Sequence, residues 1–270
     1  MNALIDCHTH SLHSFDGEAP VEELCRQAVR RGLSVYGLTD HCDLTKNTGE
    51  ELFFEIQSSV REVEAFRESC REPVIFLTGI ELGQAVDNYP AAEKAAALCD
   101  YDFVIGSIHN AGGIEDFYFE DYSKMSMGQI DELMQDYFDR LILLIDWGKA
   151  DTLAHITYPF SYMAGEYGLD ISAERYRSFF DEILIKMIQS DMALEVNTSG
   201  LRQKLGKTLP DGALLSRYRE LGGKLITLGS DAHKTEDIGA GIPQALLLLR
   251  QIGFDAVYYY KNRHPVKIGL

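Results

Sequence analysis

This chain of 270 residues has no cysteine pairs, no long apolar runs and no excess of basic residues. Its five cysteines form no CxxC pair, and because their number is odd we expect reduced, mostly buried thiols rather than a disulfide framework. The nearest approach to a membrane span, residues 141–145, is far too short to cross a bilayer. Asp6 and His8 follow Met1 too closely to leave room for a signal peptide. We therefore expect a cytoplasmic protein with no membrane partner.

Positive charge is also scarce, since 25 lysines and arginines face 42 acidic residues and leave a formal net charge of -17. A nucleic-acid groove needs a basic face, and no basic cluster stands out, so we expect no nucleic-acid partner. An anionic small molecule remains compatible with this charge, because bound divalent cations can reverse the local sign. Linkers, low-complexity segments and internal repeats are absent, so we expect one domain over residues 1–270.

The most informative stretch is ALIDCHTH at residues 3–10, a short apolar run that ends in two histidines one residue apart. Side chains alternate faces along a strand, so His8 and His10 point the same way and Cys7 and Thr9 the other. Two imidazoles on one face at the end of a buried strand can serve as a pair of metal ligands. Taken alone, the same pattern also fits two solvated loop histidines.

Apolar strand patterns and amphipathic helix patterns alternate along the whole chain. Strands are predicted at 3–10, 33–38, 74–80, 103–108, 152–154, 192–196 and 224–228. Helices are predicted at 21–31, 51–69, 91–98, 127–147, 173–189, 212–220 and 243–252, before an extended tail from residue 257. Seven such alternations indicate an α/β fold with a parallel sheet covered by helices, closed into a distorted (β/α)7 barrel.

Residues of the types that commonly bind metal ions fall at the C-terminal ends of these strands. They are His8, His10, His41, Glu81, His109, His155, Asp231 and His233. In barrels of this kind the strand C-termini form the active-site rim. Imidazoles and carboxylates without an inward cysteine suit Zn, Mn or Fe, and a carboxylate among histidines can bridge two ions roughly 3.5–4 Å apart. The pattern therefore predicts hydrolysis at a multinuclear metal centre.

These motifs, taken in order, resemble those of the polymerase and histidinol phosphatase (PHP) family over nearly the whole chain. The matching stretches are His8-Thr9-His10, Thr39-Asp40-His41, Glu81, Gly106-Ser107-Ile108-His109, His155 and Gly229-Ser230-Asp231-Ala232-His233. Each motif alone is weak, but the ordered set is specific. The resemblance implies a distorted seven-stranded barrel that binds three metal ions at its C-terminal mouth and hydrolyses phosphate esters.

The resemblance also implies a ligand set for each of three divalent ions. The first would bind His8, His10, Glu81 and Asp231; the second Glu81, His109 and His155; the third Asp16, His41 and His233. His13 is the alternative to Asp16, because some family members use histidine there, and Asp16 also fits a residue that caps the turn before Gly17. Asp40 is expected to orient a ligand rather than to bind metal.

Within the family the chain most resembles the histidinol-phosphatase branch, on its length, the run Asn197-Thr198-Ser199-Gly200-Leu201-Arg202 and the tail at 260–263. Arg202 would hold the phosphate of a small phosphorylated substrate through two parallel hydrogen bonds; an exposed loop arginine is the alternative. Residues 156–162 lack the second arginine that histidinol phosphatases often carry, which leaves the substrate less certain than the chemistry. Asp231 or His233 would assist proton transfer while a water activated between two metals attacks phosphorus.

L-Histidinol phosphate is accordingly the leading substrate, in a step of histidine biosynthesis. Two alternatives remain: a phosphoesterase of the same family that acts on another phosphomonoester or a nucleotide, and a non-catalytic metal-binding module. The complete ligand set disfavours the module. We expect no covalent phosphoenzyme, because there is no P-loop lysine motif and no cysteine precedes an arginine in a phosphatase-type loop.

Overall fold

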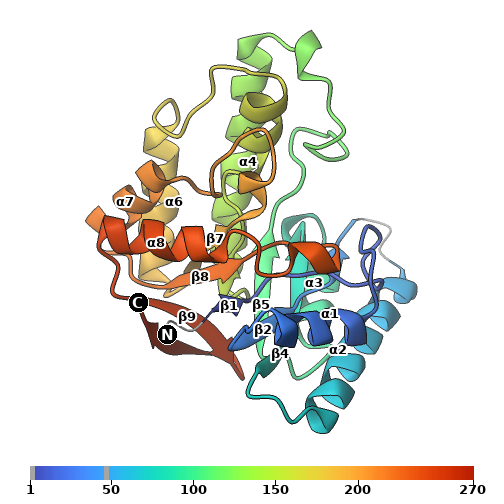
Figure 1. The fold of residues 1–270 in the computed structure, drawn as a ribbon. Coiled ribbons are helices and arrows are strands. Elements are labelled where there is room, and N and C mark those ends of the chain that lie inside the picture. The colour runs from blue at the N-terminus through green and yellow to red at the C-terminus, as the bar shows by residue number, and fades with distance from the viewer. Residues whose placement is uncertain (1–3, 46–48) are drawn as a thin grey trace.

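The computed structural model describes residues 4–45 and 49–270, and its central feature is a parallel sheet rolled into an incomplete barrel (Figure 1). The strands are β1 (Ile5–Asp6), β2 (Val35–Leu38), β3 (His41–Asp43), β4 (Ile75–Gly83), β5 (Phe103–Ser107), β6 (Thr152–Leu153), β7 (Ala193–Asn197) and β8 (Ile226–Gly229). Seven follow one another in the order β1-β2-β4-β5-β6-β7-β8, and β3 pairs with the second half of β4. The predicted (β/α)7 barrel is confirmed.

Backbone hydrogen bonds between the first and last strands bring the two edges of the barrel together. The amide of Cys7 donates to the carbonyl of Leu228 at 2.8 Å, and the amide of Asp231 donates to the carbonyl of His8 at 2.8 Å. Thr9 also forms a parallel bridge with Ala232. The two ends of the sequence thereby place their metal-binding motifs side by side.

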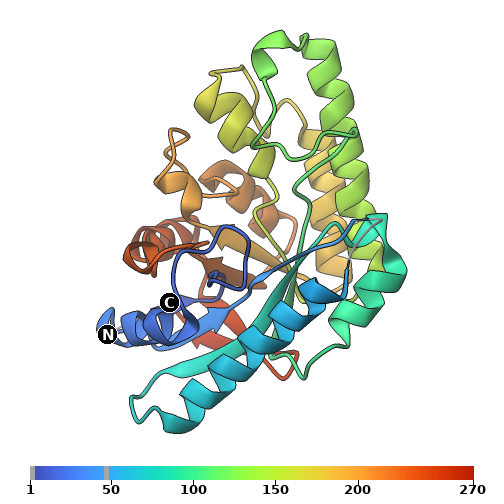
Figure 2. The same cartoon turned by 90° about the vertical axis from the view of Figure 1, so that its right-hand side faces the viewer.

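Helices cover the outside of this sheet (Figure 2). They are α1 (Val21–Arg30), α2 (Glu50–Ser69), α3 (Tyr89–Ala96), α4 (Met127–Trp147), α5 (Tyr158–Phe160), α6 (Arg177–Gln189), α7 (Gly212–Glu220) and α8 (Ile242–Ile252). The longest, α4, begins with a capping box between Ser126 and Gln129 and ends at Gly148, whose φ of 70° suits glycine. The short α5 and the helical turn η3 (Ser161–Glu166) were not predicted from sequence.

The ring of Phe103, on β5, fills the interior of the barrel at a level where β2 and β4 carry glycines, Gly37 and Gly79. A Cβ atom at Gly37 or at Gly79 would lie 2.8 Å from the ring of Phe103. Phe103 is 2% exposed and belongs to the main apolar core. Because the ring occupies this space, the centre of the barrel is packed and only its ends can hold a site.

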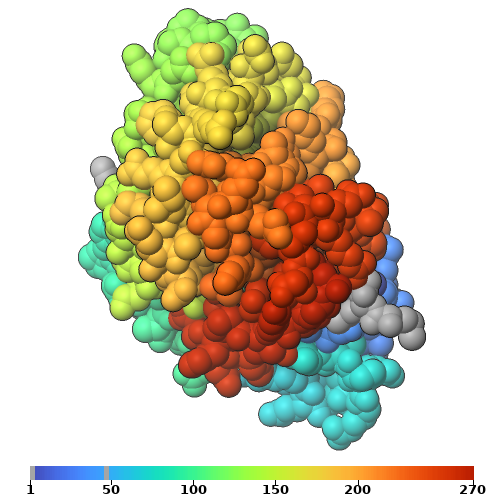
Figure 3. Space-filling model, turned by 90° about the vertical axis from the view of Figure 1, so that its left-hand side faces the viewer, coloured from blue at the N-terminus to red at the C-terminus, as the bar shows by residue number. Residues whose placement is uncertain are grey.

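The predicted extended tail is an antiparallel hairpin of β9 (Ala256–Lys261) and β10 (His264–Gly269). Arg263 lies in the turn between the two strands. Its amide donates to the carbonyl of Asp102 at 2.7 Å, and its guanidinium lies 2.5 Å from the Asp151 carboxylate. Asp102 and Asp151 immediately precede β5 and β6, so the hairpin covers the N-terminal end of the barrel. Figure 3 shows the hairpin, in dark red, forming one face of the molecule with the helices of the C-terminal half.

Other details also differ from the sequence-based expectation. β4 continues to Gly83, so Glu81 lies within the strand instead of following it. β3 was not predicted, and it places His41 at its first residue, paired in register with Glu81. Among the described residues no helix is long and apolar enough to cross a membrane. The five cysteines are unpaired, and three of them are buried.

Candidate metal and active site

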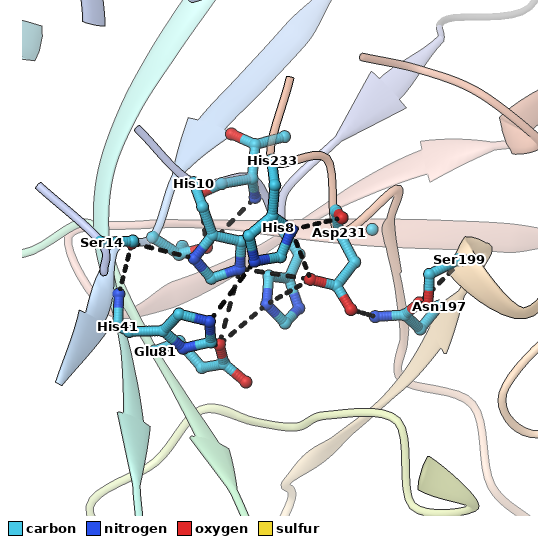
Figure 4. Close-up of polar contacts among 12 residues, drawn as sticks. His8, His10, Ser14, His41, Glu81, Asn197, Ser199, Asp231 and His233 are labelled. Atoms are coloured by element: carbon cyan, nitrogen blue, oxygen red, sulfur yellow. Dashed lines mark hydrogen bonds and ion pairs between the residues drawn. The ribbon is translucent and has the colours of Figure 1, made fainter. Parts of the chain in front are cut away.

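Nine side chains predicted as metal ligands converge at the C-terminal mouth of the barrel. Figure 4 labels His8, His10, His41, Glu81, Asp231 and His233 among them. They follow β1 (His8, His10 and Asp16), lie on β3 and β4 (His41 and Glu81), or follow β5, β6 and β8 (His109, His155, Asp231 and His233). All are buried except Asp16, Asp231 and His233, which lie nearer the solvent. Strand alternation explains the convergence, because each strand ends with these side chains turned into the barrel.

Glu81 lies at the centre of this group and has no solvent exposure. Its Oε2 lies 2.8 Å from His41 Nδ1 and 3.2 Å from His8 Nε2. Its Oε1 lies 3.1 Å from His109 Nε2 and 3.0 Å from His155 Nε2. One carboxylate therefore lies within 3.2 Å of four imidazoles, two on each oxygen, with His10 Nε2 farther from Oε2 at 3.6 Å; a bridging ligand requires such neighbours on both oxygens.

Asp231 is the second carboxylate of the group. Its Oδ1 lies 3.2 Å from His10 Nε2 and 3.8 Å from His8 Nε2, and its Oδ2 accepts a hydrogen bond from Asn197 Nδ2 at 3.1 Å. The backbone of Asp231 has a φ of 56°, a left-handed conformation that is unfavourable for a side chain of this kind. The bond from the Asp231 amide to His8 holds the residue in this conformation.

The structure separates the two candidates for the third ligand set. Asp16 Oδ2 lies 3.2 Å from His233 Nε2, and its Oδ1 lies 3.7 Å from His41 Nε2. His13 instead faces α2, with Nδ1 at 2.7 Å from Glu55 and Nε2 at 3.2 Å from Glu62. Asp16 therefore lies with the other candidate ligands, whereas His13 ties its loop to a helix.

Oxygen atoms behind the imidazoles fix which ring nitrogen faces the centre. His8 Nδ1 lies 2.6 Å from Glu195 Oε1, His109 Nδ1 lies 3.2 Å from Asp43 Oδ1, and His233 Nδ1 lies 3.0 Å from the carbonyl of Asp231. These oxygens can only accept, so in the neutral ring Nδ1 carries the proton and Nε2 presents its lone pair. Ligating histidines in metalloproteins commonly have such partners.

Sequence reasoning missed Glu195, which supports two of the candidate ligands. Besides His8, it accepts hydrogen bonds from the amide of His155 at 2.9 Å and from Asn197 Nδ2 at 3.2 Å. His155 has a φ of 24°, so this bond holds a strained backbone. A carboxylate inside the apolar stretch 192–196, on the same strand face as Asn197, was the signal that could have found it.

Asp40 acts as the sequence predicted, behind the ligands rather than among them. Its Oδ1 accepts from the amide of Ser11 and the hydroxyl of Ser14, both at 2.6 Å, and its Oδ2 accepts from Ser59 at 2.5 Å. The Ser14 hydroxyl in turn lies 3.3 Å from His10 Nδ1 and accepts from the amide of His41 at 3.0 Å. Asp40 thus orients Ser14, which contacts the imidazole of His10 and the backbone of His41.

Burial and neighbouring charge shift the pKa values of these groups in opposite directions. Burial alone would lower the pKa of His8, but the carboxylates of Glu195 and Glu81 outweigh it and raise that pKa well above its ordinary value. Burial would raise the pKa of Glu81, but the imidazoles of His8 and His41 hold it well below its ordinary value. Burial and the imidazole of His41 together hold the pKa of His10 well below its usual range. The site therefore favours ionised carboxylates and attracts cations.

The donor set fits divalent metal ions. The described residues include four groups of three side chains in which the ligand atoms of each group lie within 4.8 Å of one another: His8-His10-Glu81, His41-Glu81-His109, His8-His155-Asp231 and His10-His41-His233. Among the described residues, His8 Nε2, His10 Nε2, His41 Nδ1 and Glu81 Oε2 are buried and make no hydrogen bond. Buried polar atoms without a partner are costly, and a metal ion would satisfy them together. The predicted ligand sets assign His41 and Glu81 to different ions, but His41 Nδ1 lies 2.8 Å from Glu81 Oε2.

A cavity of about 450 Å³ opens above these residues, within the ~300–1,000 Å³ typical of small-molecule sites. Arg202 lines it, as predicted for a phosphate ligand, but one edge of the guanidinium is already engaged. Its Nη2 donates to the carbonyl of Ser230 at 2.9 Å, and its Nε lies 3.4 Å from Asp237 Oδ1. These contacts fix the guanidinium at the cavity wall, and among the described residues no hydrogen bond or ion pair engages Nη1.

Comparison with known proteins finds relatives over nearly the whole chain. A protein of Thermotoga maritima named probable histidinol-phosphatase is 29% identical over 252 residues, which cover 93% of this chain and 94% of that protein. A histidinol-phosphatase of Lactococcus lactis is 26% identical over 273 residues, covering 97% and 98%.

A crystal structure of histidinol phosphate phosphatase from Lactococcus lactis, complexed with zinc, L-histidinol and phosphate, has the same fold. It superposes with a TM-score of 0.80 at 22% sequence identity, over 99% of this chain and 100% of that one. The model of the PHP domain matches residues 6–199, which is most of the chain. The chain therefore belongs to the PHP domain family.

Proposed function

We propose that this protein is a metal-dependent phosphomonoesterase, formed by one domain, that hydrolyses L-histidinol phosphate to L-histidinol and phosphate. The observation that carries the proposal is the contact of Glu81 with four imidazoles at the floor of an open cavity. Relatives named histidinol-phosphatase match nearly the full length of the chain, which supports the substrate. The formal charge of -17 supports a small phosphorylated substrate over nucleic acid.

We assign three divalent ions, Zn, Mn or Fe, to the nine converging ligands. His8, His10, Glu81 and Asp231 would hold the first; Glu81, His109 and His155 the second; Asp16, His41 and His233 the third. When bound, such ions neutralise phosphoryl charge and make hydroxide available from water at neutral pH. The protein contributes the ligand geometry, which Glu195, Asp43 and Asp40 hold from behind.

The remaining chemistry falls to side chains that line the cavity. Arg202 would bind the phosphoryl oxygens through Nη1, because its other donors are engaged by Ser230 and Asp237. Asp231 or His233 would assist proton transfer to the leaving alkoxide oxygen; His233 could do so only while its Nε2 carries a proton and binds no ion, because its Nδ1 proton is held by the carbonyl of Asp231. The Asp231 carboxylate stays ionised, because the nearby imidazoles outweigh its burial and lower its pKa, and it would keep His233 oriented.

The test is phosphate release from L-histidinol phosphate and from a panel of phosphomonoesters, with Mn-loaded, Zn-loaded and chelator-treated protein. We expect selective turnover of L-histidinol phosphate that is lost on chelation. The Glu81→Gln variant, purified in the same way, is the control for contaminating phosphatases and should be inactive.

Each of the other outcomes contradicts part of the proposal. Turnover of other esters but not of L-histidinol phosphate would move the protein to another substrate within the same chemistry. Absence of turnover with either metal would exclude the enzymatic function and leave the metal-binding module.

A further inference from the structure

The wall of the cavity formed by the segments after β5 and β6 differs from the rest of its lining. Asp116, Tyr118 and Phe119 come from the segment between β5 and α4, and Tyr158 and Tyr162 from α5 and η3 after β6. None of these residues belongs to the nine candidate metal ligands. The wall therefore combines one carboxylate with four aromatic rings beside the metal-binding floor.

Asp116 is held rigidly in this wall. Its Oδ1 accepts hydrogen bonds from the hydroxyl of Tyr158 at 2.9 Å and from the amide of Tyr118 at 2.7 Å. Among the described residues no lysine or arginine pairs with it, although the side chain is half-buried. Burial raises the pKa of this carboxyl, as expected where no fixed cation lies against it. A half-buried carboxylate without a fixed cation beside it is stabilised by a cationic ligand.

Aromatic rings at the rim are unusually exposed. Phe15 is 79% exposed, Tyr118 63% and Phe119 65%. Phe15 stacks on His41 with ring centroids 5.3 Å apart, and Tyr118 packs edge-on against Tyr162 at 5.5 Å. Large apolar rings grouped at the rim of a cavity mark a surface that a ligand covers, and their faces attract cations and planar groups.

Basic side chains line another part of the cavity, beside the carboxylates of Asp231 and Asp237. Arg202, after β7, and Lys234, after β8, are the two basic side chains among the described residues that line the cavity. A ligand with an anionic phosphate at one end and a cationic group at the other would match both parts of the cavity at once. A phosphate ester of a neutral alcohol would leave Asp116 unpaired.

We propose that Asp116, oriented by Tyr158 and flanked by the rim rings, binds the cationic end of the substrate and determines its specificity. The ligand class is a phosphomonoester whose alcohol carries an ammonium or a protonated heteroaromatic ring. The inference rests on the proposed function, which it deepens by assigning the group that selects the leaving alcohol. Asp116 is a specificity-determining residue here, and it takes no part in breaking the P–O bond.

The test compares Asp116→Asn with wild type and with Glu115→Gln, a matched control on the adjacent exposed residue. We expect Asp116→Asn to lower kcat/KM for L-histidinol phosphate about 10- to 100-fold, mainly through KM, because a charge-assisted contact is lost. The kcat/KM for p-nitrophenyl phosphate, which has no cationic group, should stay within about twofold. Tyr158→Phe should give a smaller loss of the same kind, and Glu115→Gln no change.

A second readout does not depend on turnover. Calorimetric titration of the metal-loaded protein with L-histidinol should show Kd rising at least about tenfold in Asp116→Asn, while inorganic phosphate binds as before. The metal content of the variant should equal that of wild type.

The outcomes separate this inference from the proposed function. Wild type inactive on L-histidinol phosphate would overturn the proposed function, and L-histidinol binding would still test the subsite. Equal binding and equal selectivity in Asp116→Asn would overturn the inference alone. Loss of bound metal in Asp116→Asn, or an equal defect in Glu115→Gln, would also overturn it, because the residue would then act through the metal centre or through folding of the loop.

Discussion

The two ends of the barrel both bury carboxylates, but they neutralise them differently. At the N-terminal end, Asp102 lies 2.9 Å from Lys261, and Asp151 lies 2.5 Å from Arg263. At the C-terminal mouth, Glu81 contacts imidazoles, and among the described residues no lysine or arginine reaches it. A permanent cation fixes the first end, whereas titratable imidazoles leave the second end able to exchange protons for metal ions. In barrel enzymes the first end serves stability and the second serves function.

Backbone strain follows the same division of roles. His155 and Asp231, at the mouth, have positive φ values of 24° and 56° although neither is glycine. Each such conformation costs about 1–3 kcal/mol and persists only where surrounding contacts enforce it. At the other end, Asn262 and Arg263 also have positive φ values, but they form the two-residue turn of a hairpin, where such values are ordinary. Strain at the mouth therefore positions ligands, and strain at the hairpin only reverses the chain.

The largest effect is expected at Glu195, which supports the mouth from beneath. Glu195→Gln keeps the shape of the side chain but replaces one of its acceptor oxygens with a donor, so His8 or the amide of His155 loses its partner. We expect metal affinity to fall about 10- to 100-fold, measured by competition with a chromogenic chelator. Glu182→Gln, on an exposed position of α6, is the matched control. Unchanged metal affinity in Glu195→Gln would show that Glu195 does not position the ligands.

A smaller effect, on stability alone, is expected at the opposite end. Asp102→Asn removes the charge that pairs with Lys261 and Arg67. We expect a loss of about 1–3 kcal/mol in the free energy of unfolding, below the full cost of a broken buried pair because both cations are partly exposed. Denaturant unfolding measures this loss, and kcat/KM should stay within about twofold of wild type. A large loss of activity with full stability would contradict the assignment of this end to stability.

The smallest effect is expected from pH on the metal-free protein. Burial opposes the charged form of His41, but Glu81 outweighs it and raises the pKa of His41 to about 9. Because this pKa lies above the unfolded value near 6.5, its stabilisation is complete below about pH 6.5 and is lost as pH rises through about 9. We expect Tm of the metal-free protein to fall as pH rises between these values. The metal-loaded protein should show no such fall, since metal keeps the imidazoles neutral; equal pH profiles would contradict metal binding at His41.

Much of the fold could be read from the sequence because strands and helices carry their own periodicity. The limits of α4 and α7 were predicted to the residue, since a capping residue begins each of them. β3, α5 and the C-terminal hairpin were not predicted as such, because they are short and depend on contacts with distant segments. β3, for example, exists only where it pairs with β4.

The sequence by itself determined which chemistry the chain carries, because the order and spacing of its histidines and carboxylates place a ligand at the end of almost every strand. Only the tertiary structure decided which of these residues meet. It brought Asp16 and not His13 beside His233, put Glu195 beside His8, and placed Asp116 and Arg202 in the lining of one cavity. The physical reason is that strand periodicity fixes the direction of a side chain locally, whereas contacts across the barrel depend on how distant strands close around it.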